Sequence, residues 1–411
     1  AQQDELEQQE ALIEEGHRLS AGYDYDAAIE LIQSYDGYED IPEMTDAIET
    51  YETAKAAAVK YEDVTEITHI FYHSLIVDTS LAFDGDSEEN GYNEVMATVD
   101  EFKAILQEMY DRGYVLVSIH DIGHIEIQED GSEKMVPGEI YLPEGKKPYV
   151  LSQDDVSYYH YMEDDGFATK IVIGEDGTPT CEYVEEDGTV VYGDYDMIPL
   201  VDSFVEEHPD ASYRGARGII TLTGYNGILG YRTDPSYQGN DDDLSSWKQE
   251  WLDAHPDFDY EQECEEASAV AEALKADDWE FASHSYGHRY YGQISESDFI
   301  WDSNYWEETV EPLIGETDIM IFAFGDDIGD WQPYTSDNSR YQHLKELGFD
   351  YFCNVDSAQY WVQFGDDYLR QGRRNIDGNR MWEALSGGKD RLSDLFDVKE
   401  VFDPARPTPV V

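Results

Sequence analysis

Residues 279–288 read Trp-Glu-Phe-Ala-Ser-His-Ser-Tyr-Gly-His, a short apolar strand pattern that runs directly into two histidines. Residues 149–155 read Tyr-Val-Leu-Ser-Gln-Asp-Asp, and a similar strand pattern ends there at two carboxylates. In parallel α/β folds, reactive side chains gather where strands end and loops begin. The two stretches therefore predict parallel strands whose ends bring carboxylates and imidazoles to one edge of a sheet.

Other parts of the chain repeat this strand pattern, and helical patterns lie between several of them. The expected strands are Ile67–Phe71, Tyr114–Ile119, Tyr149–Ser152, Gly218–Leu222, Trp279–Ala282, Ile319–Phe324 and Tyr351–Val355. The expected helices are Val95–Asp111, Leu244–Ala254, Glu261–Ala276, Phe299–Ile314 and Arg340–Leu347. Strands that alternate with helices predict an α/β fold, either a barrel or a doubly wound sheet.

The chain is expected to divide into two parts. Residues 1–62 have helical periodicity and predict a small N-terminal helical module, in which residues 19–32 resemble half of a tetratricopeptide-type hairpin without a following repeat. Residues 63–411 form the second part. Two Glu-Asp-Gly turn signals within 170–193 predict a β-meander inserted there. Three prolines after residue 403 predict an irregular tail.

The composition limits the possible partners. The 411 residues include 93 Asp and Glu against 25 Lys and Arg, for a net charge of −68. Nucleic-acid binding depends on basic residues that displace counterions, so a nucleic-acid partner is excluded. No apolar run reaches the roughly 18 residues of a membrane span. The acidic surface is interpreted as an adaptation to salt or to an extracellular setting, and the alternative is that it concentrates cations near a site.

Three pairs of histidines recur at a spacing of four residues, namely His69/His73, His120/His124 and His284/His288. The 11 histidines would give only about 0.3 such pairs by chance. Two imidazoles at this spacing can reach one ion, and a carboxylate completes the site. The three distant cysteines allow one disulfide at most and no thiolate zinc site.

Pairs of aspartates carry little information by themselves in so acidic a chain. Further runs, expected to be solvated loop charges, are Asp164-Asp165, Asp241-Asp242-Asp243, Asp277-Asp278, Asp326-Asp327 and Asp366-Asp367. Asp154-Asp155 together with His284-Ser-Tyr-Gly-His288 is more specific. This combination resembles the polysaccharide deacetylase family, the carbohydrate esterases with a NodB-type domain, over about residues 63–360. Tyr72-His73 and Phe322-Ala-Phe-Gly325 are similar to two further family elements.

The resemblance implies a distorted (β/α)7-type barrel and a role for each motif residue. Asp155, His284 and His288 would hold a divalent metal, with zinc favoured, and Asp154 would be the general base for attack of metal-bound water on an acetyl carbonyl. Ser285 is expected to support its loop through a hydroxyl hydrogen bond, rather than to act as a nucleophile.

The chain departs from the family pattern at several places. Gln153 and Val156 replace the usual Phe and Gly beside the aspartates, and residues 322–327 lack the arginine that often braces the base. No histidine follows His343, so the usual C-terminal general acid is missing, and His73 or His160 could replace it.

Arginines cluster in the C-terminal part of an otherwise acidic chain, at Arg370, Arg373, Arg374 and Arg380. A network of structural ion pairs is the preferred interpretation. The alternative is that one of these arginines braces Asp154 or binds an anionic group of a substrate.

The leading hypothesis is therefore a metal-dependent deacetylase that acts on an acetylated polysaccharide or oligosaccharide, with an N-acetylhexosamine polymer favoured. A second hypothesis is a catalytically weak or inactive cell-surface protein that binds glycans on the same barrel. A third places the metal on His120 and His124 in a different hydrolase. An extracellular or cell-surface location is expected, with a mature or trimmed chain that lacks its signal segment, although a cytoplasmic protein of a salt-adapted organism would have the same composition.

Overall fold

A closed parallel β-barrel forms the centre of the molecule in the computed structural model, which describes residues 2–239 and 244–411. In order around the ring, its strands are β2 (Thr68–Tyr72), β7 (Lys147–Gln153), β11 (Ile219–Leu222), β12 (Glu280–Ser283), β13 (Ile319–Ile321), β14 (Tyr351–Val355) and β16 (Leu369–Asn375). Each strand pairs in parallel with the next, and β16 pairs with β2 to close the ring. The predicted α/β barrel of the (β/α)7 type is confirmed. The run Asp241–Asp243 lies outside the described residues.

The expected strand Tyr114–Ile119 is present but shorter, and it is not part of the ring. β3 (Tyr114–Leu116) pairs with the first half of β7, and Leu116 forms a bridge with Ser212. The expected extension to Ile119 ends where α7 (Ile119–Ile122) begins. The strand that completes the ring is instead β16. Its sequence is polar, so apolar patterning does not mark it. β13 is also shorter than expected, because Ala323–Gly325 forms a 3-10 turn.

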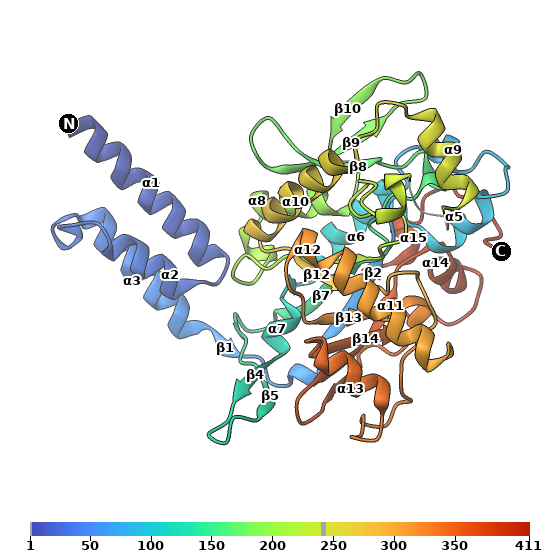
Figure 1. Ribbon diagram of the computed structural model, residues 1–411. Coiled ribbons are helices and arrows are strands. Elements are labelled where there is room, and N and C mark those ends of the chain that lie inside the picture. The colour runs from blue at the N-terminus through green and yellow to red at the C-terminus, as the bar shows by residue number, and fades with distance from the viewer. Residues whose placement is uncertain (1, 240–243) are drawn as a thin grey trace.

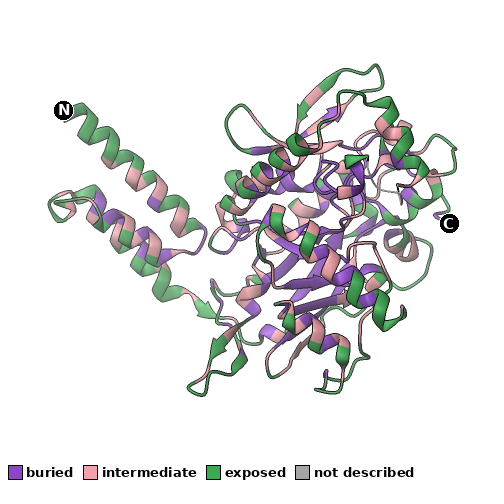
Figure 2. Ribbon diagram, viewed as in Figure 1, coloured by how far each residue is buried: buried purple, intermediate pink, exposed green. Residues whose placement is uncertain are grey.

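The two faces of the ring strands belong to different parts of the core. Inward-facing residues gather in one apolar cluster, which includes Val150, Ile219, Ala282, Ile321, Cys353 and Leu369. Outward-facing residues pack against the surrounding helices in a second cluster. This alternation follows from the two-residue period of a strand. Figure 2 shows the buried strands enclosed by helices that are exposed on their outer sides.

Helices surround the barrel on the outside (Figure 1). They are α6 (Val99–Asp111), α8 (Met197–Glu207), α10 (Tyr260–Ala276), α11 (Glu296–Thr309), α12 (Glu311–Ile314), α13 (Ser339–Glu346) and α14 (Gly378–Leu385). Helix α6 begins at a capping box, in which Thr98 and Glu101 each accept the backbone N–H of the other. In the part of the chain that the structure describes, no helix is long and apolar enough to span a membrane.

The N-terminal helices lie to one side of the barrel (Figure 1). They are α1 (Gln2–Ala21), α2 (Tyr25–Gln33) and α3 (Pro42–Ala57), and they share a small core of Ala28, Ile32, Met44, Ala47 and Tyr51. The turn between α1 and α2 contacts the barrel, where the backbone N–H of Arg214 donates to the carbonyl of Gly22 at 2.7 Å. Behaviour of residues 1–62 as a separate domain stays a prediction.

The inserted β-meander is confirmed at the expected place. β8 (Lys170–Ile173), β9 (Pro179–Val184) and β10 (Val190–Gly193) pair antiparallel in sequence order. Gly177 and Gly188 have φ of 84° and 85° in the two connecting turns, a conformation that glycine adopts without steric cost. The remaining elements are β1 (Val59–Lys60), β4 (Gly123–Ile127), β5 (Glu133–Pro137), β6 (Tyr141–Leu142), β15 (Val362–Phe364), α4 (Thr79–Ala82), α5 (Glu89–Val95), α9 (Ser246–Ala254) and α15 (Val398–Val401).

The expected irregular C-terminal tail is held firmly against the barrel domain. Arg406 pairs with Glu101 at 2.7 Å, and both side chains are fully buried. Arg406 also donates to the backbone carbonyl of Asn93 at 2.8 Å. A buried ion pair with several hydrogen bonds is costly to break, so the tail is an integral part of the fold. Cys181, Cys264 and Cys353 are free thiols, and the one disulfide that the sequence allows is absent.

Candidate metal centre

The two motifs meet at the C-terminal end of the barrel. Asp154 and Asp155 directly follow β7, and His284 directly follows β12, with only β11 between these two strands. Since all ring strands are parallel, their carboxyl ends lie at the same mouth of the barrel. The strand order therefore explains how residues about 130 positions apart come to share one site.

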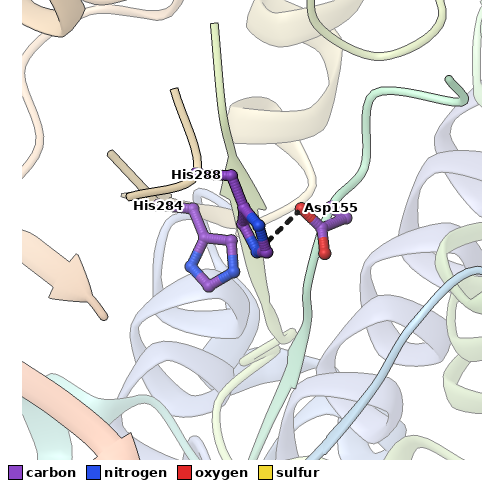
Figure 3. A group of neighbouring side chains, drawn as sticks. All are labelled: Asp155, His284 and His288. Atoms are coloured by element: carbon purple, nitrogen blue, oxygen red, sulfur yellow. Dashed lines mark ion pairs between the residues drawn. The ribbon is translucent and has the colours of Figure 1, made fainter. Parts of the chain in front are cut away.

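Among the described residues, Asp155, His284 and His288 form a group whose ligand atoms all lie within 4.8 Å of one another. Figure 3 shows the three side chains pointing toward one another, with an ion pair of 3.7 Å between His288 Nε2 and Asp155 Oδ1. Ligands around a tetrahedral zinc ion stand roughly 3.4 Å apart, so a small contraction would close this group on an ion. Two imidazoles and one carboxylate also form a donor set used by catalytic zinc sites, which keep an open position.

The protonation of His284 suits a ligand. Its Nδ1 lies 2.8 Å from the carbonyl oxygen of Ile321, which can only accept, so Nδ1 donates and Nε2 keeps its lone pair. Burial lowers the pKa of His284 below its ordinary value and outweighs the attraction of the two nearby carboxylates. The imidazole of His284 is thus neutral, and its Nε2 can bind a metal together with Asp155 and His288.

Asp155 is oriented by a neighbouring tyrosine. The hydroxyl of Tyr159 donates to Asp155 Oδ1 at 2.7 Å, and it also lies 2.8 Å from the hydroxyl of Thr223. Burial raises the pKa of Asp155, but three histidines, led by His288, outweigh burial and lower it overall. The carboxylate therefore stays ionised, as a metal ligand must.

The loops of this site contain strained backbone. Asp155, Ser285, His288 and Phe324 have φ of 58°, 63°, 53° and 58°. Residues other than glycine rarely adopt this left-handed conformation, and such strain collects at functional sites. Ser285 Oγ accepts the backbone N–H of Arg289 at 2.8 Å, the kind of loop support that was expected of it.

Asp154 lies beside the group of Asp155, His284 and His288 and is held by Arg373, one of the four clustered arginines for which a brace on Asp154 was the alternative interpretation. Two parallel hydrogen bonds join the guanidinium to the carboxylate, from Nη1 to Oδ1 at 2.7 Å and from Nη2 to Oδ2 at 2.9 Å. His284 Nε2 lies 3.8 Å from Asp154 Oδ2. Burial raises the pKa of Asp154, but the charge and hydrogen bonds of Arg373, together with the nearby His284 and His73, outweigh burial and leave the pKa below its ordinary value. Asp154 is therefore an ionised carboxylate next to the candidate metal group.

The other clustered arginines form the expected ion pairs. Arg370 pairs with Asp327 at 2.8 Å, Arg374 with Asp394 at 2.7 Å, and Arg380 with Glu383 at 3.0 Å. The preferred interpretation, structural ion pairs, thus applies to Arg370, Arg374 and Arg380. The alternative, a brace on Asp154, applies to Arg373, the one member of the cluster that contacts Asp154. No local pattern singles out Arg373 among the four, because its contact with Asp154 follows from the pairing of β16 within the barrel.

A cavity of about 470 Å³ opens over the two motifs. Its lining includes Asp154, Asp155, His284, His288, His73 and Arg373, with apolar walls from Phe71, Met96, Tyr161 and Phe324. His73 follows β2, and its Nε2 lies 3.7 Å from Asp155 Oδ2 with the side chain 23% exposed. His160, the other candidate general acid, is not part of the lining. Its Nε2 and the hydroxyl of Tyr237 form a hydrogen bond of 2.7 Å elsewhere.

His120 and His124 do not share an ion site. His120 lies near the first residue of β12, at the opposite end of the barrel, where its ring contacts Glu280 through Nδ1 and Asp318 through Nε2. His124 lies on the exposed hairpin and pairs with Glu126 at 3.3 Å. Both ring nitrogens of His120 are hydrogen-bonded to carboxylates. A cleft of about 680 Å³ lies beside His120 at this end of the barrel. The third hypothesis is therefore unsupported.

The charged state of His120 gives a pH-dependent contribution to stability. Burial lowers the pKa of His120, but the hydrogen bonds to Asp318 and Glu280 outweigh burial and raise the pKa from 6.5 to about 10. When the pKa of a histidine is higher in the folded state than in the unfolded state, its protonation stabilises the fold. This stabilisation is fully present at a pH below the pKa of the unfolded state, and it is lost as the pH rises through the pKa of the folded state. We expect His120→Gln to lower the free energy of unfolding most at about pH 6 and progressively less toward pH 10.

Urea unfolding of both proteins at several pH values measures this difference. His124→Gln is the matched control, because its exposed imidazole should leave the free energy of unfolding unchanged at each pH. A loss of stability in His120→Gln that is the same at pH 6 and pH 10 would contradict the assignment of a charged imidazole.

Comparison with protein-family models and with curated proteins gave no match. Among solved structures, the Streptococcus pyogenes deacetylase PplD in complex with acetate aligns at 14% identity and a TM-score of 0.39, over 79% of this chain and 95% of that chain. The protein named "putative polysaccharide deacetylase BA0330", from Bacillus anthracis, aligns at 11% identity and a TM-score of 0.40, over 82% of this chain and 70% of that chain.

Proposed function

We propose that this protein is a metal-dependent deacetylase that removes acetyl groups from a glycan, with an N-acetylhexosamine polymer as the favoured substrate and zinc as the favoured metal. The observation that carries the proposal is the Asp154 carboxylate, held by Arg373 beside the group of Asp155, His284 and His288 in one cavity. An ionised carboxylate next to a His₂-carboxylate group suits metal-assisted hydrolysis of an amide, with the carboxylate as general base.

Each residue has a defined task in the reaction. A divalent ion, when bound, lowers the pKa of a water and polarises a carbonyl. Asp154 accepts the proton of the attacking water, and Arg373 keeps both carboxylate oxygens in place for it. The C–N bond of the acetamide then breaks, the nitrogen takes up a proton, and acetate and a free amine are released.

His73 is the proposed donor of the proton to the leaving nitrogen. It lines the cavity, whereas His160 does not. We expect His73→Gln to lower kcat on an acetamido sugar by about 100-fold, since proton transfer contributes 10²–10⁴-fold. An aryl acetate, whose leaving group needs no proton, should lose less than about 3-fold by the same reasoning. Equal losses on both substrates would contradict this role.

The glycan-binding hypothesis loses its motivation in this geometry. It rested on the missing bracing arginine and the missing C-terminal histidine, whereas Arg373 donates to Asp154 and His73 lines the same cavity. Release of acetate from acetylated chito-oligosaccharides by the zinc-loaded protein, measured enzymatically, tests the deacetylase proposal. Absence of release from these substrates and from acetylated xylan would favour binding without turnover.

We also propose that the protein acts outside the cell or on its surface. The support is the excess of 93 acidic over 25 basic residues, together with a glycan as substrate. Fractionation of the source cells, followed by immunodetection, checks the location, and detection in the cytoplasmic fraction alone would refute it.

A further inference from the structure

A chain of buried polar side chains lies inside the barrel, directly below the proposed base. His69 on β2, Ser152 on β7 and Gln371 on β16 are each at most 1% exposed. They come from three neighbouring strands, with β2 in the middle. Buried polar groups are costly unless they are hydrogen-bonded, so their partners decide what the chain does.

The hydrogen bonds of this chain have a fixed direction. The Gln371 side-chain NH₂ donates to the carbonyl of Ile67 at 3.1 Å, so its oxygen faces His69 Nδ1 at 3.0 Å and accepts from it. Burial lowers the pKa of His69 well below its ordinary value, so the ring is neutral and its Nε2 accepts. The donor to Nε2 is the hydroxyl of Ser152, at 2.8 Å.

The chain ends on the arginine that holds Asp154. Once Ser152 donates to His69, its oxygen is free to accept, and Arg373 Nη1 donates to it at 3.1 Å. Every hydrogen bond in the series thus donates away from Arg373. The same Nη1 donates its other hydrogen to Asp154. Without Ser152, one buried N–H of Arg373 would lack an acceptor, and the guanidinium would turn to find another.

Other contacts fix Arg373 less completely. Its Nε donates to the carbonyl of Asn354 at 3.3 Å, and its guanidinium carbon lies 4.0 Å from the centre of the Phe71 ring. Neither contact involves Nη1 or Nη2, the two nitrogens that bind Asp154. Ser152 is therefore the neighbour that sets the orientation of the two terminal nitrogens of the Arg373 guanidinium.

We propose that His69 is a positioning residue, which acts through Ser152 to keep Arg373 in its two-bond contact with Asp154. This inference rests on the proposed function, in which Asp154 is the general base. It goes beyond that function because it assigns a task to a histidine that touches neither substrate nor the metal group. A histidine that served only as a satisfied core residue would support the barrel without affecting turnover.

Kinetics of three single variants separate these roles. We expect Ser152→Ala and His69→Leu each to lower kcat for acetate release by about 10-fold, at unchanged KM and unchanged zinc content. The matched control is Thr221→Val, because Thr221 is a fully buried barrel residue whose hydroxyl has no hydrogen-bond partner among the described residues. Thr221→Val should keep the wild-type kcat. A Ser152→Ala variant as active as this control would overturn the proposal.

A double-mutant cycle tests whether the effect passes through Arg373. In an Arg373→Lys background, the two-bond contact is already lost, so adding Ser152→Ala should change kcat by less than about 2-fold. A further 10-fold loss in that background would show that Ser152 acts by another route and would overturn the proposal.

A crystal structure of Ser152→Ala gives a readout that does not depend on turnover. We expect Arg373 to lose at least one of its two hydrogen bonds to Asp154. Retention of both hydrogen bonds would overturn the proposal. This test remains valid if the His69→Leu variant fails to fold. If the wild type releases no acetate, the proposed function fails, while this crystal structure still decides whether Ser152 positions Arg373.

Discussion

Replacement of Asp154 by Asn is expected to lower kcat for acetate release by about 10³-fold, within the range of general acid–base catalysis. Asn has nearly the same shape and still offers one oxygen to Arg373, but it cannot take a proton from water. The metal group lies on other residues, so zinc content should stay at the wild-type level. Acetate release and zinc content, measured on the same protein preparation, check both expectations.

The barrel offers a matched control for this variant. Asp327, which was expected to be a solvated loop charge, is an aspartate with a side chain only 8% exposed; it is bonded to Arg370 at 2.8 Å and is not among the residues that line the cavity. Asp327→Asn removes the same charge from another aspartate–arginine ion pair, joined by one hydrogen bond, and should keep a kcat within a few fold of wild type. A kcat for Asp154→Asn equal to that of Asp327→Asn would mean that Asp154 has only a structural role.

Loss of any one ligand is expected to abolish tight zinc binding. Asp155→Ala and His284→Ala each leave two of three protein donors, and we expect the affinity for zinc to fall by more than about 10³-fold and acetate release to fall to background. Equilibrium dialysis against buffered zinc, followed by elemental analysis, measures the affinity. Since a bound metal stabilises the folded state, a chelator should lower the Tm of the wild type but not of these variants.

His124→Ala is the control for the ligand variants, because His124 belongs to the rejected pair and lies on an exposed hairpin. Its zinc content and its Tm response to chelator should equal those of the wild type. Unchanged zinc content in Asp155→Ala and His284→Ala, or loss of zinc in His124→Ala, would contradict the placement of the site.

The strands that the sequence predicted are continuous runs of mostly apolar residues, a pattern that indicates a strand buried on both faces of the sheet. β14 has the expected bounds, and β2, β7, β11 and β12 differ from the expected ranges by one or two residues at one or both ends. Patterning also predicted a strand at Tyr114–Ile119, of which Tyr114–Leu116 forms the buried strand β3. Burial alone does not tell which strands close a ring, because that depends on pairing between distant segments.

β16 shows why part of the site could not be found from the sequence. Its residues include Arg370, Gln371, Arg373 and Arg374, which are polar and yet fully or nearly fully buried. They are tolerated because each has a partner from a distant segment, such as Asp154, which lies 219 positions before Arg373. The spacing within each motif is a local signal, so the metal group was predicted, whereas the brace of the base depends on tertiary contacts.

The central claim is that Asp155, His284 and His288 bind one cation at the mouth of the barrel. A crystal of the protein grown with zinc, and measured at the zinc absorption edge, tests it most directly. The claim predicts a strong anomalous peak about 2.0–2.2 Å from Asp155 Oδ, His284 Nε2 and His288 Nε2. An anomalous map with no peak between these three side chains, or with its main peak beside His120, would contradict it.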